Sequence, residues 1–447
     1  MTEETLAPLY LNSAAEIDSK NPFEADLYGR HILAKRLTGF LSRLPHGAVI
    51  AIDSAWGEGK TWFGRRWKAQ LENEGYRTGY IDCFARDYLD DPFAMIAGEI
   101  IALSKKSKSG AGDKILELGK KIGAALLPVT AKVAVNFLGH WALGKTGLGD
   151  DLMKNAEALN KATAEGLEKL VAAKLEEYQK DNETIEAFKT ELTKLAAEDD
   201  KPLIIFLDEL DRCRPDFAVR TIERMKHFFD APKVVFVLLW NRQQMVAAIE
   251  GIYGPNIDAD GYLQKFVQLS LRFPKRSSLE LNGIDDNRKH CIELLDQYGF
   301  SKGSDRQGFE FIFSILAAHF GMSFRDVERA VALYSLAQPI QFSSVFVAWP
   351  IALKIARPKL FARLLVGAQG AHLDAYKEIS QIVVRGDQHS YEREYLDFFN
   401  LLHKAGVNEF SEIPPGLSSH LANRRWNGDV KGFFDWAFQR IDLTVTL

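Results

Sequence analysis

One short stretch constrains the fold of this chain more than any other: the apolar run 48–53, AVIAID, followed at once by SAWGEGKT at 54–61. A buried strand, a glycine-rich turn and a helix that starts with Lys-Thr form the pattern of a phosphate-binding loop. Glycines let the backbone turn and bring N–H groups to phosphate oxygens, and the helix N-terminus adds a positive dipole end. The pattern predicts a loop of this kind at the end of a strand in an α/β sheet.

The loop departs from the GxxxxGK[ST] pattern at its first position, where Ser54 replaces glycine. A glycine-rich turn with an exposed lysine is therefore the alternative interpretation. If the pattern holds, Lys60 reaches the β- and γ-phosphates and the Thr61 hydroxyl binds Mg²⁺. The residues expected to contact the nucleotide in and after the loop are Ser54, Trp56, Gly57, Glu58, Gly59, Lys60, Thr61 and Trp62.

A second motif, LIIFLDELDRC at 203–213, supplies the acids that such a loop needs. Asp208 would hold Mg²⁺ through water, and Glu209 would orient or deprotonate the attacking water. Asp211 is a weaker candidate for the same work. Acids after a strand also occur as simple helix caps, but both motifs in one chain and in this order favour nucleotide binding.

Asn241 follows another apolar run, VVFVLLW at 234–240. Its amide would touch the γ-phosphate or the attacking water, or else it is a turn residue before a helix. Both interpretations remain open on the sequence.

The order of elements predicts an α/β P-loop fold: a parallel sheet with a long helical insertion and a C-terminal α-helical extension. We expect strands at 48–53, 78–84, 203–207 and 234–240, and helices at 62–74 and 92–103. The predicted segments are a leader (1–22), the first part of the core (23–103), the helical insertion (104–200), the second part of the core (201–275), a helical lid (276–345) and a C-terminal helical region (346–447).

Composition and one apolar segment bear on the cellular compartment of the chain and on its contact with nucleic acid or membrane. The chain has 447 residues and three widely spaced cysteines, which favour a reducing cytoplasm. Its formal net charge of −4 gives no sign of nucleic-acid binding. Residues 122–143 are long enough to span a bilayer. However, Lys132, Asn136 and His140 form one polar stripe at helical spacing, so an amphipathic helix packed on protein is favoured over a membrane span.

Together these motifs resemble the KAP family of P-loop NTPases, a branch near AAA+ and STAND ATPases. The resemblance covers about 22–275, with a lid-like extension to about 340. Its segments are WGEGKT, YIDCFARDYLDDPF, FKTELTKLAAEDDKPLIIFLDELDRCRPDFAVRTIERMKHFF, VVFVLLWNRQQMVAAIEGIYG and YLQKFVQLSLRFP. It implies ATP binding and slow hydrolysis with Mg²⁺, with Asp208 and Glu209 as the Walker B pair. It also implies that 104–200 is an insertion, which holds membrane helices in some family members.

The resemblance suggests further site residues. Tyr28 and Arg30 flank a turn that would frame the adenine, unless the turn is a simple helix start. GMSFRDVERAVALYSL resembles a sensor-2 segment, in which Arg325 would reach the γ-phosphate or else pair with a neighbouring acid. Arg212 and Arg214 would be arginine fingers for a neighbouring subunit, or would bridge to Asp211 or Asp216.

The function that these features favour is an ATP-driven switch, acting as a homo-oligomer or with a separate effector protein. The resemblance to the family suggests a role in signalling or anti-phage defence. A scaffold that holds nucleotide without turning it over is the alternative, and a membrane-associated organiser depends on 122–143. The long interval between the two motifs disfavours a compact small-molecule kinase, and the net charge disfavours a DNA translocase.

Overall fold

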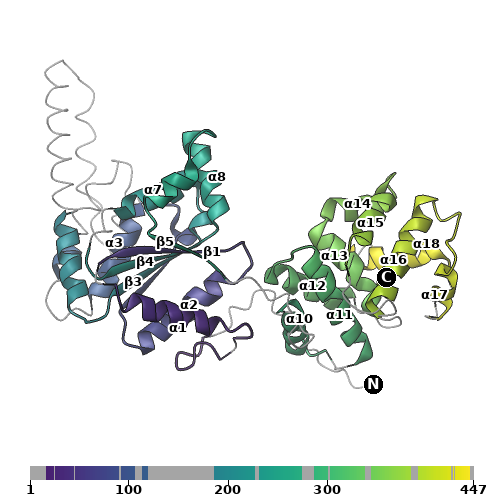
Figure 1. Cartoon of the computed structure of the whole chain (residues 1–447), viewed down its shortest axis with the longest axis horizontal. Coiled ribbons are helices and arrows are strands. Elements are labelled where there is room, and N and C mark those ends of the chain that lie inside the picture. The colour runs from purple at the N-terminus through teal and green to yellow at the C-terminus, as the bar shows by residue number, and fades with distance from the viewer. Residues whose placement is uncertain are drawn as a thin grey trace, which may run out of the picture. The chain divides into compact units, whose positions relative to one another are not determined.

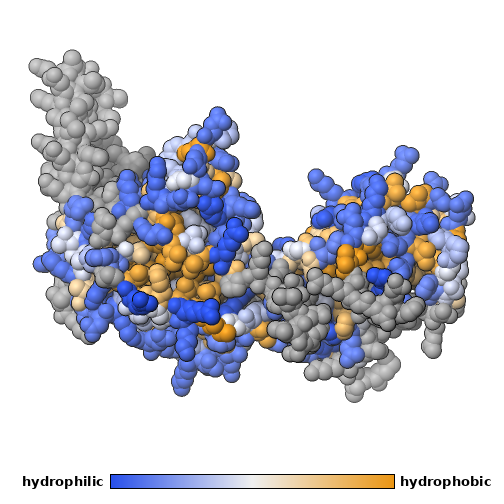
Figure 2. Space-filling model, in the orientation of Figure 1, coloured by the Kyte–Doolittle hydropathy of each residue, from blue (hydrophilic) through white to orange (hydrophobic). Residues whose placement is uncertain are grey.

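The computed structural model describes residues 17–24, 26–44, 46–89, 92–105, 113–118, 186–226, 231–273, 286–300, 303–337, 344–383, 391–423, 426 and 428–442. These residues form two compact units, 17–273 and 286–442. On the visible face of each unit, hydrophilic residues cover much of the surface, and patches of hydrophobic residues show among them (Figure 2).

The first unit is built on a five-stranded sheet of order β2-β3-β4-β1-β5, in which every pair is parallel (Figure 1). The strands are β1 (Ala48–Asp53), β2 (Thr78–Asp82), β3 (Leu203–Asp208), β4 (Val234–Trp240) and β5 (Leu269–Arg272). Parallel pairing confirms the predicted α/β class. Because β4 lies between β1 and β3, the ends of all three strands meet at one edge of the sheet.

Helices cover both faces of this sheet (Figure 1). One face packs against α1 (Arg30–Leu41) and α2 (Lys60–Asn73), with Trp67 and Phe206 fully buried. The other packs against α3 (Pro92–Ser104), α7 (Pro215–Met225) and α8 (Arg242–Tyr253). Strands buried on both sides read as continuous apolar runs, which is why β3 and β4 were recognisable.

The predicted elements match with small shifts. The helix expected at 62–74 begins at Lys60, directly after Gly59, and the strand expected at 78–84 ends at Asp82, because a 3₁₀ turn, η1, runs over Phe84–Arg86. Strand β5 was not predicted from the sequence. It is a four-residue edge strand in which partly buried and exposed residues alternate, so it lacks an apolar run.

The regular elements of the second unit, among its described residues, are all helices. Its elements are α10 (Asp286–Gln297), α11 (Ser304–His319), α12 (Phe324–Ala337), η5 (Ser344–Val347), α13 (Ala348–Ala356), α14 (Pro358–Leu365), α15 (Ala371–Ser380), α16 (Tyr391–Val407), α17 (Leu417–Asn423) and α18 (Val430–Asp442). One hydrophobic core runs from Cys291 to Ile441. The predicted lid and the predicted C-terminal region therefore share a core.

A histidine pair lies in this core, with His403 fully buried and His372 partly buried. The Trp349 indole donates to His403 Nε2 at 2.9 Å, and His403 Nδ1 lies 3.2 Å from His372 Nδ1. Since Nε2 of His403 accepts, its Nδ1 carries the proton and donates to His372. Burial lowers the pKa of His372 to about 4 and that of His403 well below its usual value. Both rings are therefore neutral at pH 7.

Of the predicted insertion, the structure describes helical residues 113–118 and 186–197. The candidate membrane segment 122–143 lies outside the described residues. Within the part of the chain that the structure describes, no helix has both the length and the apolar character needed to cross a bilayer.

Candidate nucleotide-binding site

The loop between β1 and α2 has the backbone of a phosphate cradle. Gly57 and Gly59 adopt positive φ angles of 81° and 82°, a conformation that costs glycine nothing. The buried Lys60 ammonium donates to the carbonyls of Ser54 and Ala55 at 2.6 and 3.0 Å. Burial lowers the pKa of Lys60, and the nearby carboxylates of Asp211 and Asp208 oppose that shift. The lysine is thus held inside the loop that it was predicted to serve.

Asp208 stands at the end of β3 and is only 2% exposed. Its carboxylate accepts hydrogen bonds from the Tyr80 hydroxyl at 2.6 Å, from the Glu209 amide at 2.9 Å and from the Thr61 hydroxyl. Burial raises the pKa of Asp208, and the hydrogen bonds from Tyr80 and Thr61 oppose the shift. A carboxylate touching a hydroxyl at a loop–helix junction is the hard-oxygen set that suits Mg²⁺.

Glu209 is held away from regular geometry. Its backbone lies in the left-handed region at φ 58°, which is uncommon for any residue but glycine and costs on the order of 1–3 kcal/mol. Its carboxylate pairs with Arg212 at 2.9 Å. Burial raises the pKa of Glu209, and Arg212 opposes the shift. Arg212 thus bridges to Glu209, a partner that the sequence did not suggest.

Two further contacts connect the turn after β3 to its neighbouring segments. The Trp56 indole donates to Asp211 Oδ2 at 2.5 Å, which joins the phosphate loop to the acidic turn. Arg214 donates to the carbonyls of Asp87 and Leu89, in the loop that follows β2. The turn after β3 is therefore joined to the phosphate loop by a pair of side chains, and to the loop after β2 by hydrogen bonds from a side chain to the backbone.

Arg30 lies against the phosphate loop from the α1 side. Its guanidinium donates to the carbonyl of Glu58 at 2.7 Å and lies 3.5 Å from that of Gly59. It also stacks near the rings of Tyr28, Trp62 and Phe273, with centroid distances of 5.2, 5.6 and 4.6 Å. These contacts make Arg30 a brace for the loop backbone. The predicted adenine contact of Tyr28 and Arg30 stays a prediction.

Asn241 and Arg325 differ in placement. Asn241 follows β4, between the loop and the acidic turn, and its side-chain oxygen caps α8 by accepting from Gln243 N at 3.1 Å. Both predicted roles are compatible with this position, because the amide nitrogen does not take part in the cap. Arg325 is an exposed residue of α12 in the second unit. Its predicted γ-phosphate contact stays a prediction.

Sequence reasoning missed Tyr80. In the strand register Tyr80 pairs with Phe206 and Asp82 pairs with Asp208, so Tyr80 reaches along its face of the sheet toward the Asp208 carboxylate. A tyrosine within an apolar strand carries no signal of this contact. It depends on β2 lying beside β3, and pairing of that kind is not written in the local pattern.

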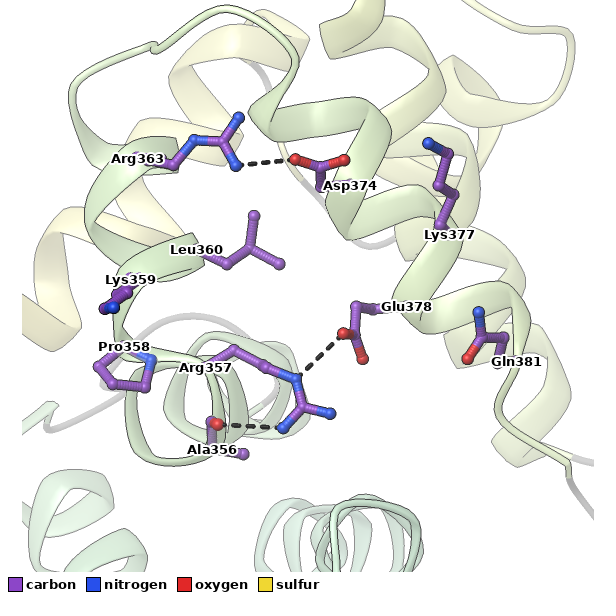
Figure 3. Close-up of a pocket in the computed structure, with 10 residues that line it drawn as sticks. All are labelled: Ala356, Arg357, Pro358, Lys359, Leu360, Arg363, Asp374, Lys377, Glu378 and Gln381. Carbon is purple, nitrogen blue, oxygen red and sulfur yellow. Dashed lines mark hydrogen bonds and ion pairs between the residues drawn. The ribbon is translucent and has the colours of Figure 1, made fainter.

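The second unit holds a separate shallow pocket of about 680 Å³ between α14 and α15 (Figure 3). Arg363 pairs with Asp374 at 2.7 Å and Arg357 with Glu378 at 3.0 Å, and Leu360 lies between the two ion pairs. Both carboxylates of the pocket thus already neutralise arginines. The chemistry of the predicted site lies instead at the sheet edge of the first unit.

A parallel sheet with a glycine-rich loop ending in Lys60 and Thr61, and with an acidic pair at the end of a nearby strand, defines a P-loop nucleoside triphosphatase. The chain matches the model of the KAP family P-loop domain over residues 31–340, and it belongs to that family. The expected family and fold class are confirmed.

Among curated proteins, the chain is similar to the Phage T7 exclusion protein of Escherichia coli (strain K12), with 24% identity over 161 residues. That match covers 32% of this chain and only 22% of the relative. Two solved structures from Aeropyrum pernix are also similar. They are the ORC2 protein in ADPNP–ADP complexes (TM-score 0.38, 11% identity, 97% of each chain) and the ORC1 protein in complex with DNA (TM-score 0.33, 15% identity, 89% of this chain and 84% of that one). TM-scores this low carry no conclusion about function.

Proposed function

We propose that this chain binds ATP with Mg²⁺ at the carboxyl edge of its sheet and hydrolyses it slowly, as a nucleotide-gated switch for a partner protein. One observation carries the proposal: Lys60, Thr61, Asp208 and Glu209, from two distant stretches of sequence, converge on one site. Each group there has a chemical type that phosphoryl transfer requires.

The residues divide the work as follows. The loop amides and Lys60 bind the β- and γ-phosphates, and Thr61 with Asp208 would hold Mg²⁺, which when bound neutralises charge on the phosphates. Glu209 orients the attacking water and accepts its proton, and its raised pKa suits a general base. Asn241 lies next along the sheet edge and would contact the same water or the γ-phosphate.

The ion pair between Glu209 and Arg212 supports slow or partner-stimulated turnover. While Arg212 holds the carboxylate, Glu209 is a weaker base and is directed toward the guanidinium. A partner or a conformational change that draws Arg212 away would free Glu209. The same pair favours the second candidate function, a scaffold that holds nucleotide with little turnover.

The switch role needs a surface that changes with the nucleotide. The helical unit after the sheet, which begins in the described residues at Asp286, is the part that we propose responds. The partner is a second copy of this chain or a separate effector. The similarity to a phage exclusion protein supports a role in antiviral defence. We propose that the chain acts in the cytoplasm.

The test measures size and turnover on the same samples. Parent, Lys60→Ala, Glu209→Gln and the control Glu24→Gln, an exposed acid of the same unit, are compared by mass photometry without nucleotide, with ADP and with Mg·ATP. We expect Lys60→Ala to abolish nucleotide binding. We expect Glu209→Gln to keep binding, to slow phosphate release by about 100-fold or more, and to hold any ATP-dependent assembly.

The outcomes separate the candidates. Phosphate release by Glu209→Gln at the parent rate would refute Glu209 as the water activator. If the parent binds ATP but keeps the same mass in every nucleotide state and releases no phosphate, the scaffold function would be favoured. Behaviour of Glu24→Gln like the parent is required for either conclusion.

A further inference from the structure

We propose that Tyr80 is a positioning residue for the metal site: its hydroxyl holds the Asp208 carboxylate in the orientation that Mg²⁺ binding needs. The inference rests on the proposed function, since it concerns the ion that would accompany the nucleotide. The hydrogen bond from Tyr80 to Asp208 Oδ2 is 2.6 Å long. A short bond from a neutral hydroxyl to a carboxylate is of the charge-assisted kind, which is stronger than a neutral pair.

The rest of the Asp208 environment explains why this bond matters. Asp208 Oδ1 accepts from the Glu209 amide, and the Thr61 hydroxyl also donates to the carboxylate. The Glu209 amide belongs to the acidic turn after β3, and the Thr61 hydroxyl belongs to the first turn of α2, where we propose that it also binds the metal. Tyr80 belongs to β2, within the sheet. In this proposal it is the donor that sets the carboxylate plane.

Several contacts keep the Tyr80 ring rigid. Its ring stacks on Phe206, with centroids 5.8 Å apart, and Arg65 lies over it at 5.8 Å. The backbone N–H of Tyr80 points out of the edge strand and donates to Glu99 Oε1 of α3 at 3.1 Å. Glu99 thus fixes the strand at the residue whose side chain reaches Asp208.

Gly64 of α2 lies where this helix meets the sheet, against Leu239 and at ordinary contact distance from the Tyr80 hydroxyl. A methyl group on Gly64 of α2 would lie 3.5 Å from the Tyr80 hydroxyl oxygen and 2.2 Å from Leu239 Cδ1. The absence of a side chain at Gly64 lets α2 pack close to the sheet, directly over this hydroxyl. The loop–helix that carries Thr61 and the strand that carries Tyr80 are thereby brought to the same carboxylate.

The experiment separates metal binding from nucleotide binding. The fluorescent analogue mant-ADP is titrated onto the full chain in EDTA, and then Mg²⁺ is titrated at fixed mant-ADP. The variants are Tyr80→Phe and Asp208→Asn, singly and together. The matched control is Tyr76→Phe, which removes a hydroxyl from another buried tyrosine, one whose ring packs against Lys201 Nζ at 4.8 Å.

We expect Tyr80→Phe to bind mant-ADP in EDTA like the parent, and to need about tenfold more Mg²⁺ for half-saturation, as is typical when an outer-shell partner of a metal ligand is lost. Tyr76→Phe should keep the parent's Mg²⁺ response. In the Asp208→Asn background, Tyr80→Phe should have no further effect on Mg²⁺, because the carboxylate on which it acts is gone.

A parent-like Mg²⁺ response in Tyr80→Phe would overturn the inference, as would an equal effect of Tyr80→Phe with and without Asp208. Failure of the parent to bind mant-ADP at all would instead refute the proposed function. If Tyr80→Phe does not fold, 3-fluorotyrosine placed at position 80 keeps the ring and the hydroxyl. Its fluorine resonance should shift when Mg²⁺ is added to the ADP complex, and a resonance that ignores Mg²⁺ would refute the role.

Discussion

Replacing Arg30 by methionine should destabilise the first unit and weaken nucleotide binding. Arg30 is 8% exposed and makes a 2.7 Å charge-assisted hydrogen bond to the Glu58 carbonyl. Such a bond contributes about 1.5–3 kcal/mol. The stacked rings, of which Phe273 is nearest at 4.6 Å, add about 0.5–1 kcal/mol. Methionine keeps the length of the side chain and removes both effects, so we expect a loss of about 2–4 kcal/mol.

For a unit of this size, that loss corresponds to a fall in Tm of about 5–15 °C. Because the loop loses its brace, the affinity for mant-ADP should fall about tenfold as well. Arg30→Lys keeps the charge and loses the planar fork, so it should fall between parent and methionine. Thermal and urea unfolding give the first quantity, and fluorescence titration gives the second.

The control is Arg36→Met, the same substitution at an exposed position of the same helix, which should change stability by less than about 0.5 kcal/mol. If the free energy of unfolding of Arg30→Met stayed within about 0.5 kcal/mol of the parent value, the contacts of Arg30 would not stabilise the unit. If it lost stability and kept full affinity, the guanidinium would support the fold and not the loop.

Two further predictions concern charge. Arg212→Ala should raise the basal rate of phosphate release several-fold, because it frees Glu209. The control Arg214→Ala leaves that carboxylate paired and should not raise the rate. A lower rate in Arg212→Ala would indicate instead that Arg212 stabilises the transition state. The second unit should lose stability in acid, because His372 and His403 are neutral when folded and the unfolded chain binds more protons below its ordinary histidine pKa of about 6.5. That stability is complete above pH about 6.5 and is lost as the pH falls toward 4. Protection factors for amide hydrogen exchange in α16, corrected for intrinsic rates, should therefore drop between pH 7 and pH 5, less so in His372→Gln, and constant protection would contradict the assignment.

Much of the first unit was predictable from local pattern. Strands 48–53 and 234–240 were predicted at their observed bounds, because a central parallel strand buries both faces and reads as an unbroken apolar run. Edge strands were harder to predict from the sequence. Strand β5 alternates and is short, so nothing in its composition separates it from a loop.

The candidate site residues show the same difference between what a local motif predicts and what depends on distant segments. Lys60, Thr61 and Asp208 were predicted because their chemistry is tied to fixed places in a strand–loop–helix and at a strand end. Arg30 was assigned to the adenine-framing turn by the resemblance to related ATPases, and that contact stays a prediction. Its contacts in the fold are with loop carbonyls 28 and 29 residues away, and no spacing rule predicts them.

By itself, then, the sequence determined the class of the protein and the motif residues of its candidate site, since both follow from short segments whose backbone shape depends on neighbouring residues. The tertiary structure alone decided which distant groups contact those residues. Tyr80 holds Asp208 because β2 pairs with β3, across 128 residues of chain. The ion pair of Arg212 with Glu209, by contrast, joins residues three apart and is a local contact of the turn after β3. Contacts between distant segments depend on how strands pair and helices pack, and a local pattern contains neither.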